Sequence, residues 1–388
     1  MPSGVNGLFL SVNDEHRLVF ENFLKGIDLV KFFKKPWRRA AQQSWEGKYL
    51  FKDHRKVIAV ADPALATTIP IPVELVREPS EAKLPITVPE LENLIAQEMA
   101  KIFNGCRTEA AARLHVHELD AMLVGEKARA FRVDGDAVMD PAGFTGKKVT
   151  LLLELTFTGR EIFEKLKQFF NAPEDFYFAE SPQSRLVSLS RVRKEPLNLV
   201  FADEAGDVIP ATSSLFVFEE GRGKSGYPVL YRETFAWSFA RVFGRIASAL
   251  GVDTPVAREL YAAYCSGGFS DAAARVFKHT IDPAFDELFA EISKKKLRGF
   301  LYVDAPYGMP FPLPHRHGEA VFEPMPLVEV LETVGFAEGI SSGGGKDGAV
   351  LSEHTLSRHL LPFIEAYFDK SDTELNRKLR RRLHWLAA

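Results

Sequence analysis

The chain is poor in cysteine and has no long apolar run, and both absences narrow what it can be. Only two of its 388 residues are cysteines, Cys106 and Cys265. A disulfide framework and a zinc ribbon each need more cysteines, so both are excluded. Charged residues interrupt every hydrophobic segment before it reaches the ~18–20 residues of a membrane span. The first residues also lack the charged start and apolar stretch of a signal peptide. We therefore expect a protein of the reducing cytoplasm.

An excess of basic residues is also missing. There are 49 Lys and Arg against 52 Asp and Glu, which gives a formal net charge of -3. A dedicated nucleic-acid-binding protein usually carries a basic excess, so we expect no nucleic-acid partner. What the chain does have is 46% hydrophobic residues, with 31 Phe against 9 Tyr. This composition is typical of a globular protein and predicts a core filled largely by Phe.

The first half of the chain predicts a small α+β unit. Thr87 followed by Glu90 predicts a capped helix over 87–103. A helix is also expected over 160–170, with antiparallel strands between the two helices. The predicted strands are a buried one at 56–62 and three more at 112–124, 127–133 and 147–157. Prolines at 63, 70 and 72 indicate a loop or a sheet edge.

The second half predicts a larger α/β region. A hairpin joins 214–219 to 227–233, and the stretch 186–192 fits either a strand or a helix. Residues 341–348 have the Gly-rich composition of a flexible loop. The other expected elements are strands at 197–203 and 297–304 and helices at 237–250, 254–264, 270–296 and, with a break near Pro362, 352–386.

Two glycine-rich stretches look like phosphate-binding loops but lack the context of one. Residues 221–226 spell G-x-G-x-x-G, yet a strand rather than a helix follows them. A dinucleotide site needs helix N–H groups at that point, so a hairpin tip fits better. Residues 343–346 end in Lys, but Asp347 stands where a P-loop has Ser or Thr. We interpret both stretches as loops.

Two H-x-H pairs raise the possibility of a metal site. Residues i and i+2 of a strand share a face, so His115 with His117, or His315 with His317, can share one metal ion if each pair lies in a strand. The carboxylates that could complete a set are Glu118, Asp120 and Asp304. Such a site would support metal-assisted hydrolysis. The alternative is that these are surface or structural histidines.

The C-terminal segment predicts an amphipathic helix with a cationic flank. Leucines at 375, 379, 383 and 386 follow helical spacing. One interpretation is a helix that lies on anionic lipid. The other is a helix that docks on the core and leaves its arginines in solvent. The candidate membrane-binding residues are Arg377, Lys378, Leu379, Arg380, Arg381, Arg382, Leu383 and Trp385.

The stretch from Lys56 to Phe157 resembles the inserted subdomain of FtsA and PilM, actin-like proteins of bacterial cell division and type IV pilus assembly. The resemblance rests on KVIAVAD at 56–62, ITVPELENLIAQ at 86–97 and LHVHELDAMLV at 114–124. It continues through FRVDGDAVMDPAGFTGKKVTLLLELTFT at 131–158, in which DPAGFTG at 140–146 resembles a family turn. The second half has the matching order of elements, and the basic tail sits where FtsA-like proteins carry a membrane-targeting helix.

The resemblance implies an actin-like, ribonuclease H-like α/β fold of two lobes. Residues 1–83 would form a divergent start of the first lobe and 84–172 the inserted subdomain. Residues 173–340 would form the second lobe, and 341–388 a flexible loop with C-terminal helices. Actin-like ATPases hold phosphate in Gly-rich turns, and here the corresponding positions keep Asp203, Gly206, Asp304 and Gly308 but lose most of the glycines. We expect weak or lost ATPase activity, with either no cofactor or weakly bound Mg-ATP.

The resemblance therefore implies a scaffold rather than an enzyme. The first hypothesis is an FtsA-like division scaffold that self-associates, binds division proteins and is tethered by its tail to the inner face of the cell membrane. The second is a PilM-like cytoplasmic adaptor of type IV pilus assembly, which binds a membrane partner's peptide and needs no lipid-binding tail. The third is a metal-dependent hydrolase that uses the H-x-H pairs.

Overall fold

The computed structural model describes most of the chain between residues 56 and 326 and parts of both ends. The described residues are 5–12, 18–22, 27–28, 56–62, 65–167, 176–190, 192–193, 197–201, 213–219, 229–235, 237–295, 299–305, 307–326, 329–330, 341–342, 361–362, 365 and 373–386. They form a mixed α/β protein with several sheets, which confirms the coarse fold class expected from the sequence.

The first sheet has the order β2-β1-β4-β9. It is built from β1 (Val5–Val12), β2 (Leu18–Asn22), β4 (Lys56–Ala61) and β9 (Phe176–Glu180). β1 and β2 are antiparallel, whereas β1, β4 and β9 are parallel neighbours. The continuous small and β-branched run of β4 fits a strand buried on both faces, and its last four residues are buried.

The second sheet has the order β12-β11-β10-β13-β15-β14. Its central four strands repeat the directions of the first sheet, because β11 is antiparallel to β10 whereas β10, β13 and β15 are parallel. The strands are β10 (Leu197–Phe201), β11 (Ser213–Glu219), β12 (Val229–Phe235), β13 (Gly299–Asp304), β14 (His315–His317) and β15 (Ala320–Glu323). A short bridge joins β3 (Ile27–Asp28) to β16 (Ser341–Ser342).

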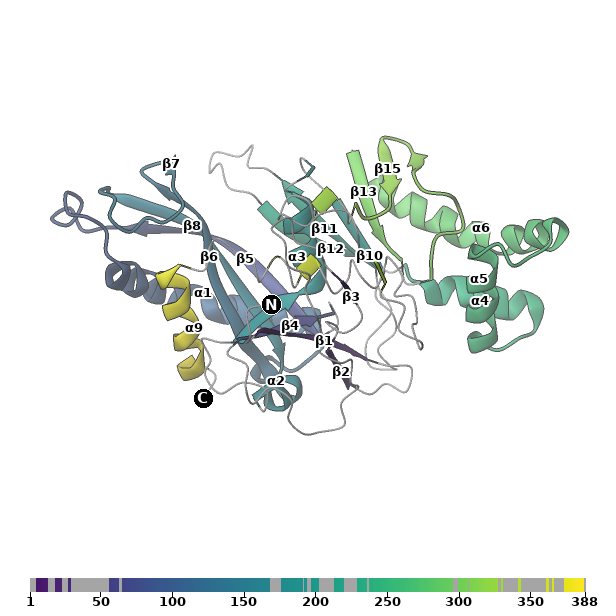
Figure 1. Cartoon of the computed structure of the whole chain (residues 1–388), viewed down its shortest axis with the longest axis horizontal. Coiled ribbons are helices and arrows are strands. Elements are labelled where there is room, and N and C mark those ends of the chain that lie inside the picture. Colours follow the sequence, from purple (N-terminus) through teal and green to yellow (C-terminus); the bar gives the residue numbers. More distant parts are fainter. Residues whose placement is uncertain are drawn as a thin grey trace.

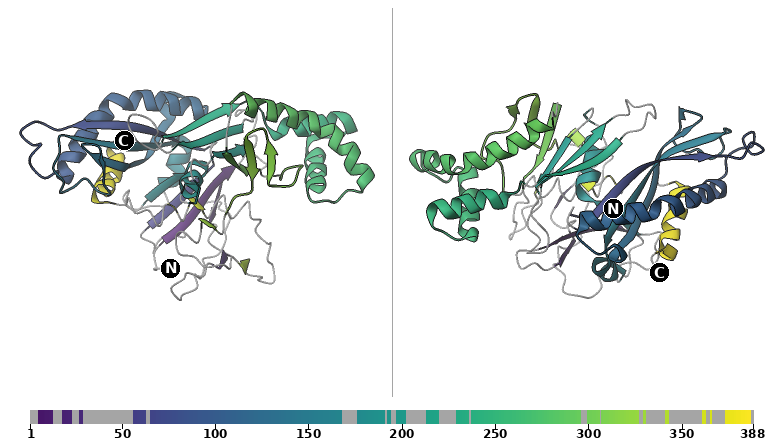
Figure 2. Two further views of the ribbon diagram at one scale, coloured as in Figure 1. Left: turned by 90° about the horizontal axis from the view of Figure 1, so that it is seen from above. Right: turned by 180° about the vertical axis from the view of Figure 1, so that it is seen from behind.

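A third, antiparallel sheet stands between β4 and β9 in the sequence. It has the order β5-β8-β6-β7, from β5 (Ala66–Val76), β6 (Ala121–Val133), β7 (Asp136–Ala137) and β8 (Lys148–Gly159). We call it the insert sheet. Figures 1 and 2 show it at one end of the molecule, with α4, α5 and α6 at the other. The prolines at 70 and 72 lie in its edge strand, where a missing N–H costs no ladder hydrogen bond.

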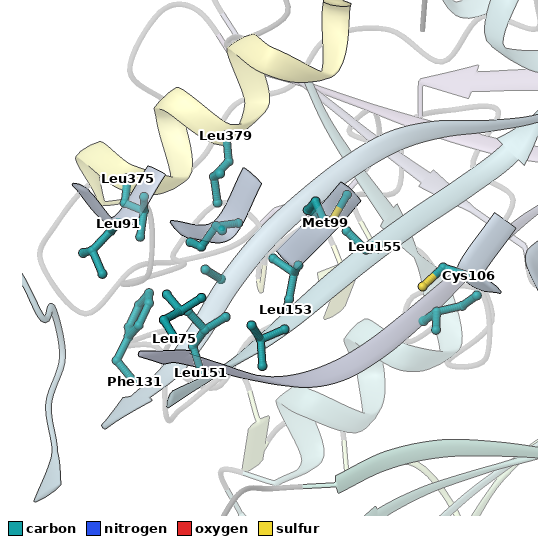
Figure 3. Close-up of a cluster of buried hydrophobic side chains, with 14 of the residues drawn as sticks. Leu75, Leu91, Met99, Cys106, Phe131, Leu151, Leu153, Leu155, Leu375 and Leu379 are labelled. Atoms are coloured by element: carbon teal, nitrogen blue, oxygen red, sulfur yellow. The ribbon is translucent and has the colours of Figure 1, made fainter. Parts of the chain in front are cut away.

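The helix α1 (Val88–Leu114) covers one face of the insert sheet. Its start is the predicted capping box, in which Thr87 accepts from the Glu90 amide and Glu90 from the Thr87 amide. The terminal helix α9 (Glu374–Leu386) lies beside α1 and β6 (Figure 1). Figure 3 shows Leu375 and Leu379 of α9 on the side of the sheet that carries Leu151, Leu153 and Leu155.

A second core lies under helices α4 (Phe239–Leu250), α5 (Thr254–Cys265) and α6 (Asp271–Lys294). The indole of Trp237 is buried there, and its N–H donates to the carbonyl of Ala284. Phenylalanine rings fill this cluster, as the Phe-rich composition predicts. Phe239 meets Tyr261 and Phe285 edge to face, whereas Phe285 stacks on Tyr261.

Several elements differ from the sequence-based predictions. The helix that we predicted to end at 103 runs on to Leu114, so no strand begins at 112. The two strands predicted at 112–124 and 127–133 are the single strand β6, which contains register shifts. The undecided stretch near 186 belongs to helix α3 (Ser181–Leu189). The helix predicted over 160–170 is found as α2 (Arg160–Leu166), and residues 168–170 of that prediction lie outside the described residues. The predicted hairpin of β11 and β12 is confirmed.

Candidate functional site

Buried charged groups gather where the insert sheet meets β9, α3 and α9. A cavity of about 90 Å³ lies at this junction. That volume suits about three water molecules rather than a nucleotide. Its lining includes Thr68, Glu126, Arg129, Glu154, Tyr177, Glu180, Gln183, Glu365 and Arg380. We call this region the junction cavity.

Glu180 ties the first sheet to the other two. Its carboxylate accepts a hydrogen bond of 2.5 Å from the backbone N–H of Thr68 on β5. Its other oxygen lies 3.8 Å from the guanidinium of Arg232, which belongs to β12 of the second sheet. Burial raises the pKa of Glu180 and lowers that of Arg232, and each charge partly offsets the effect of burial on the other. Through Thr68 and Arg232, Glu180 therefore connects the three sheets at one point.

A second set of polar groups lines the junction-facing side of the insert sheet. Glu154 on β8 forms an ion pair with Arg129 of β6 and accepts a 3.3 Å hydrogen bond from the Gln183 side chain of α3. The hydroxyls of Thr68 and Thr156 are 3.0 Å apart and share a hydrogen bond. Both carboxylate oxygens of Glu154 therefore have partners, as buried carboxylates require.

The terminal helix docks on the insert through polar as well as apolar contacts. The side-chain amide of Asn376 accepts from the Ala128 N–H at 2.7 Å and donates to the Ala128 carbonyl at 2.9 Å. It thereby satisfies backbone groups of β6, as a neighbouring strand would. Arg380 donates to the hydroxyl of Tyr177, and its guanidinium lies 4.2 Å from the centre of that ring.

The docking of α9 decides which of the candidate membrane-binding residues are buried and which are exposed. Leu379 and Arg380 are buried against the body, and Arg382 forms an ion pair of 2.9 Å with Glu92 of α1. Arg377 and Arg381 are exposed, and Lys378 is half-buried, with its amine 3.4 Å from Glu374. Leu383 and Trp385 belong to the helix, but their side chains lie outside the described residues. The docked alternative describes the observed position of the helix, and lipid binding stays a prediction.

The candidate nucleotide-binding residues fall mostly outside the described part. Asp203 and Gly206 are not described, and of Asp304 only the backbone at the end of β13 is. Gly308 lies in a turn with φ +80°, and its carbonyl accepts a hydrogen bond from the Tyr261 hydroxyl at 3.1 Å. The packing of this turn on α5 gives Gly308 a structural role. Nucleotide binding therefore stays a prediction.

The histidine pairs do not meet in a metal site. His115 is the left-handed residue that ends α1, and His117 caps the short 3-10 helix Glu118–Asp120, so the strand geometry that we expected of this pair is wrong. His315 and His317 do lie in a strand, β14, but both stack on the ring of Phe289. Within the described ranges, no three His, Cys, Asp or Glu side chains lie close enough to hold a metal ion.

The arrangement at the junction cavity is suited to holding parts together rather than to catalysis. Glu154 and Glu180 are fixed by hydrogen bonds and ion pairs, so each is a cross-link between elements. Sequence reasoning missed both residues, together with Glu126 and Asn376. Glu154 stands inside the apolar run of β8, and a carboxylate in such a run is the one sequence signal that could have revealed the site.

No helix in the described part is long and apolar enough to span a bilayer.

Comparisons with known proteins add little to this geometry. No protein-family model matches the chain. No curated protein matches it either. Among solved structures, a "PilM-PilN type IV pilus biogenesis complex" is similar over 77% of this chain and 80% of that chain, with 15% sequence identity and a TM-score of 0.40. A TM-score of this size does not establish a common fold.

Proposed function

We propose that this protein is an actin-like scaffold that acts as a PilM-like adaptor, binding a partner protein of a pilus-type assembly in the cytoplasm. The strand order repeated in the first and second sheets carries the proposal. In each sheet one strand of an antiparallel hairpin, β1 or β10, is followed by two further strands that run parallel to it. These are β4 and β9 in the first sheet and β13 and β15 in the second. Two such sheets, one per lobe, are what the actin-like resemblance implies.

The position of the insert supports the same assignment. The insert sheet and α1 leave the first sheet after β4 and return at β9, two strands that are parallel neighbours. The sequence resemblance to FtsA and PilM lies in this part of the chain. Because Glu154 and Glu180 at the junction cavity are committed to structural contacts, the site favours a binding scaffold over an enzyme.

The docked terminal helix favours the adaptor over the membrane-tethered scaffold. A helix that lies on lipid must turn its apolar stripe outward. Here Leu375 and Leu379 are each 1% exposed and belong to the core of the insert. Releasing them would uncover that core and break the Asn376 contacts to β6. The division scaffold therefore needs a rearrangement that the adaptor does not.

Exposed apolar side chains at the free end of the insert offer a surface for a partner. Val76, Leu84, Met139 and Phe144 are each between 49% and 76% exposed. Their loops are joined by backbone hydrogen bonds, from Ile86 to the Phe144 carbonyl and from Gly143 to the Ile86 carbonyl. Exposed apolar side chains on such neighbouring loops can contact a partner protein. We call these four residues the insert tip.

Site-specific photo-crosslinking tests the partner. A photoreactive amino acid at 139 or 144 is expressed in the source cell, and adducts are identified by mass spectrometry. We expect an adduct with a protein of a pilus-type envelope assembly. The control position is Leu250, which is also exposed but lies on α4 at the other end of the molecule. Adducts with division proteins, equal adducts from 250, or no adduct from the tip would contradict the proposal.

Vesicle co-sedimentation separates the adaptor from the tethered scaffold. Arg377 and Arg381 are exposed, so Arg377→Glu with Arg381→Glu reverses the outward charge of α9 without touching the core. Arg275→Glu with Lys294→Glu makes the same change on α6. We expect none of the three proteins to pellet with anionic vesicles more than with neutral ones. Salt-sensitive pelleting that only the α9 pair abolishes would support the tethered scaffold instead.

A further inference from the structure

A second cavity, which the scaffold function does not use, opens between α1, β6 and α9. Its volume is about 440 Å³, within the range of small-molecule sites. Most of its wall is apolar, from α1 and from Leu379 of α9. The lining residues are Ala96, Met99, Ala100, Phe103, Asn104, Glu126, Leu379 and Arg382. We call it the α1–α9 pocket.

Glu126 places a carboxyl group in this apolar wall. It pairs across the ladder with Leu155, and Ala128 pairs with Leu153, so these four residues share the face that α1 and α9 cover. Leu153 and Leu155 are fully buried on that face. Glu126 is only 4% exposed, and it also borders the junction cavity.

The Glu126 carboxyl has no hydrogen-bond partner among the described residues, unlike Glu154 and Glu180. The charged group that acts on it is Arg382 of α9, but this guanidinium already pairs with the carboxylate and carbonyl of Glu92 of α1. Burial raises the pKa of Glu126 to about 8, against the opposing effect of Arg382. A buried carboxyl without a donor is costly unless a ligand or water supplies one.

We propose that the α1–α9 pocket binds an apolar amine, whose ammonium group pairs with Glu126 while its hydrocarbon part fills the pocket. An ammonium group can donate to the ionised Glu126 carboxyl, whereas an anion would be repelled by it. Arg382, the cation of the lining, is already paired with Glu92. Phe103 also lines the pocket, and an aromatic ring attracts positive charge where its face meets a ligand. Met99 and Leu379 supply the apolar contact for the rest of the ligand. This site is independent of the proposed adaptor function.

Isothermal titration with three matched probes tests the proposal on the full chain. The probes are 4-phenylbutylamine, the neutral 4-phenylbutanol and the anionic 4-phenylbutanoate. We expect the amine to bind about tenfold or more tightly than the alcohol, and the anion not to bind. Because the ammonium favours the ionised carboxyl, binding near pH 7 should release about one proton, seen as a dependence of the heat on buffer ionisation.

Two variants and a control locate the site. Glu126→Gln should weaken the amine about tenfold or more while leaving the alcohol unchanged, since only the ion pair is lost. Ala100→Phe should weaken the amine and the alcohol together, because it fills the mouth of the pocket. Glu74→Gln removes an exposed carboxyl of the same sheet and should change nothing.

Several results would overturn the proposal. One is equal binding of amine and alcohol to the wild-type protein. Another is amine binding that Glu126→Gln leaves intact. A third is no amine binding at millimolar concentration. Glu126→Gln is expected to fold, because it removes a buried ionisable group without a partner, and its thermal unfolding is recorded alongside.

Discussion

Both faces of the insert sheet are buried, but one is covered through apolar contacts and the other through polar contacts. On the α1 side, β8 presents Leu151, Leu153 and Leu155, and the neighbouring helices cover them with apolar side chains. On the junction side the same strand presents Glu154 and Thr156, which α3, β5 and β6 supply with partners. Both faces of this strand are therefore buried, and the side chains on each face match the elements that cover it. They are apolar under the helices and polar beside α3, β5 and β6.

The two buried carboxyls sharpen this contrast. Glu154 stands on the polar face, and both of its oxygens have partners. Glu126 stands on the apolar face, where the described residues offer its carboxyl no hydrogen bond. The first is a structural cross-link, whereas the second is a cost to folding that a ligand can relieve. The predictions below test this difference, from the largest expected effect to the smallest.

The largest effect is the pH dependence that Glu126 imposes on stability. Its pKa in the folded protein is about 8 against an ordinary value of 4.5, so the unfolded chain gives up this proton first as the pH rises. The wild-type protein should therefore lose about 1.4 kcal/mol per pH unit relative to Glu126→Gln between about pH 4.5 and pH 8, and little more above that. Urea unfolding of both proteins at pH 5 and pH 8 measures it. An equal difference at the two pH values would contradict the unpartnered state of this carboxyl.

Truncation on the apolar face comes next. Leu153→Ala removes a fully buried side chain from the core under α1 and should lower the free energy of unfolding by about 3 kcal/mol. Val76→Ala, in the same sheet but 66% exposed, should cost less than about 0.5 kcal/mol. Denaturant unfolding compares the two. Similar losses would mean that the α1 face is not the main core of the insert.

Breaking the contact between α9 and β6 should cause a loss of stability of intermediate size. Asn376→Ala leaves the N–H and carbonyl of Ala128 without their partners and should destabilise the protein by about 1–3 kcal/mol. Arg377→Ala, at the next position but exposed, is the matched control and should be close to neutral. Thermal unfolding of both variants gives the comparison. A neutral Asn376→Ala would show that α9 is not fixed to the strand.

The smallest effect is expected for a single hydroxyl on the polar face. Thr156→Val leaves the Thr68 hydroxyl without its partner and should cost about 1 kcal/mol. Thr150→Val, a half-buried position of the same strand, is the control for the change of shape. Urea unfolding resolves the difference between them. If both substitutions stabilise the protein equally, the hydroxyl pair contributes nothing to this face.

The sequence predicted local features better than it predicted the site. The Thr87 capping box and the hairpin of β11 and β12 follow from short-range chemistry and are confirmed. The end of α1 was missed because Gly105 and Cys106 do not stop a helix that packs on a sheet. Glu126 could not be assigned to the apolar face, because register shifts in β6 break the alternation on which such an assignment rests. The partners of Glu180 and Asn376 are far away in the sequence, so no local pattern reveals them.

Hydrogen exchange at β6 and α9, with and without anionic vesicles, tests the docked-tail adaptor most directly. The Ala128 amide donates to Asn376, so its protection reports whether α9 sits on the insert. The adaptor predicts that the protection of this amide and of 374–382 is the same with anionic vesicles as with neutral ones. Faster exchange at Ala128 that appears only with anionic vesicles and disappears at high salt would contradict it, because α9 would then leave the insert for the membrane.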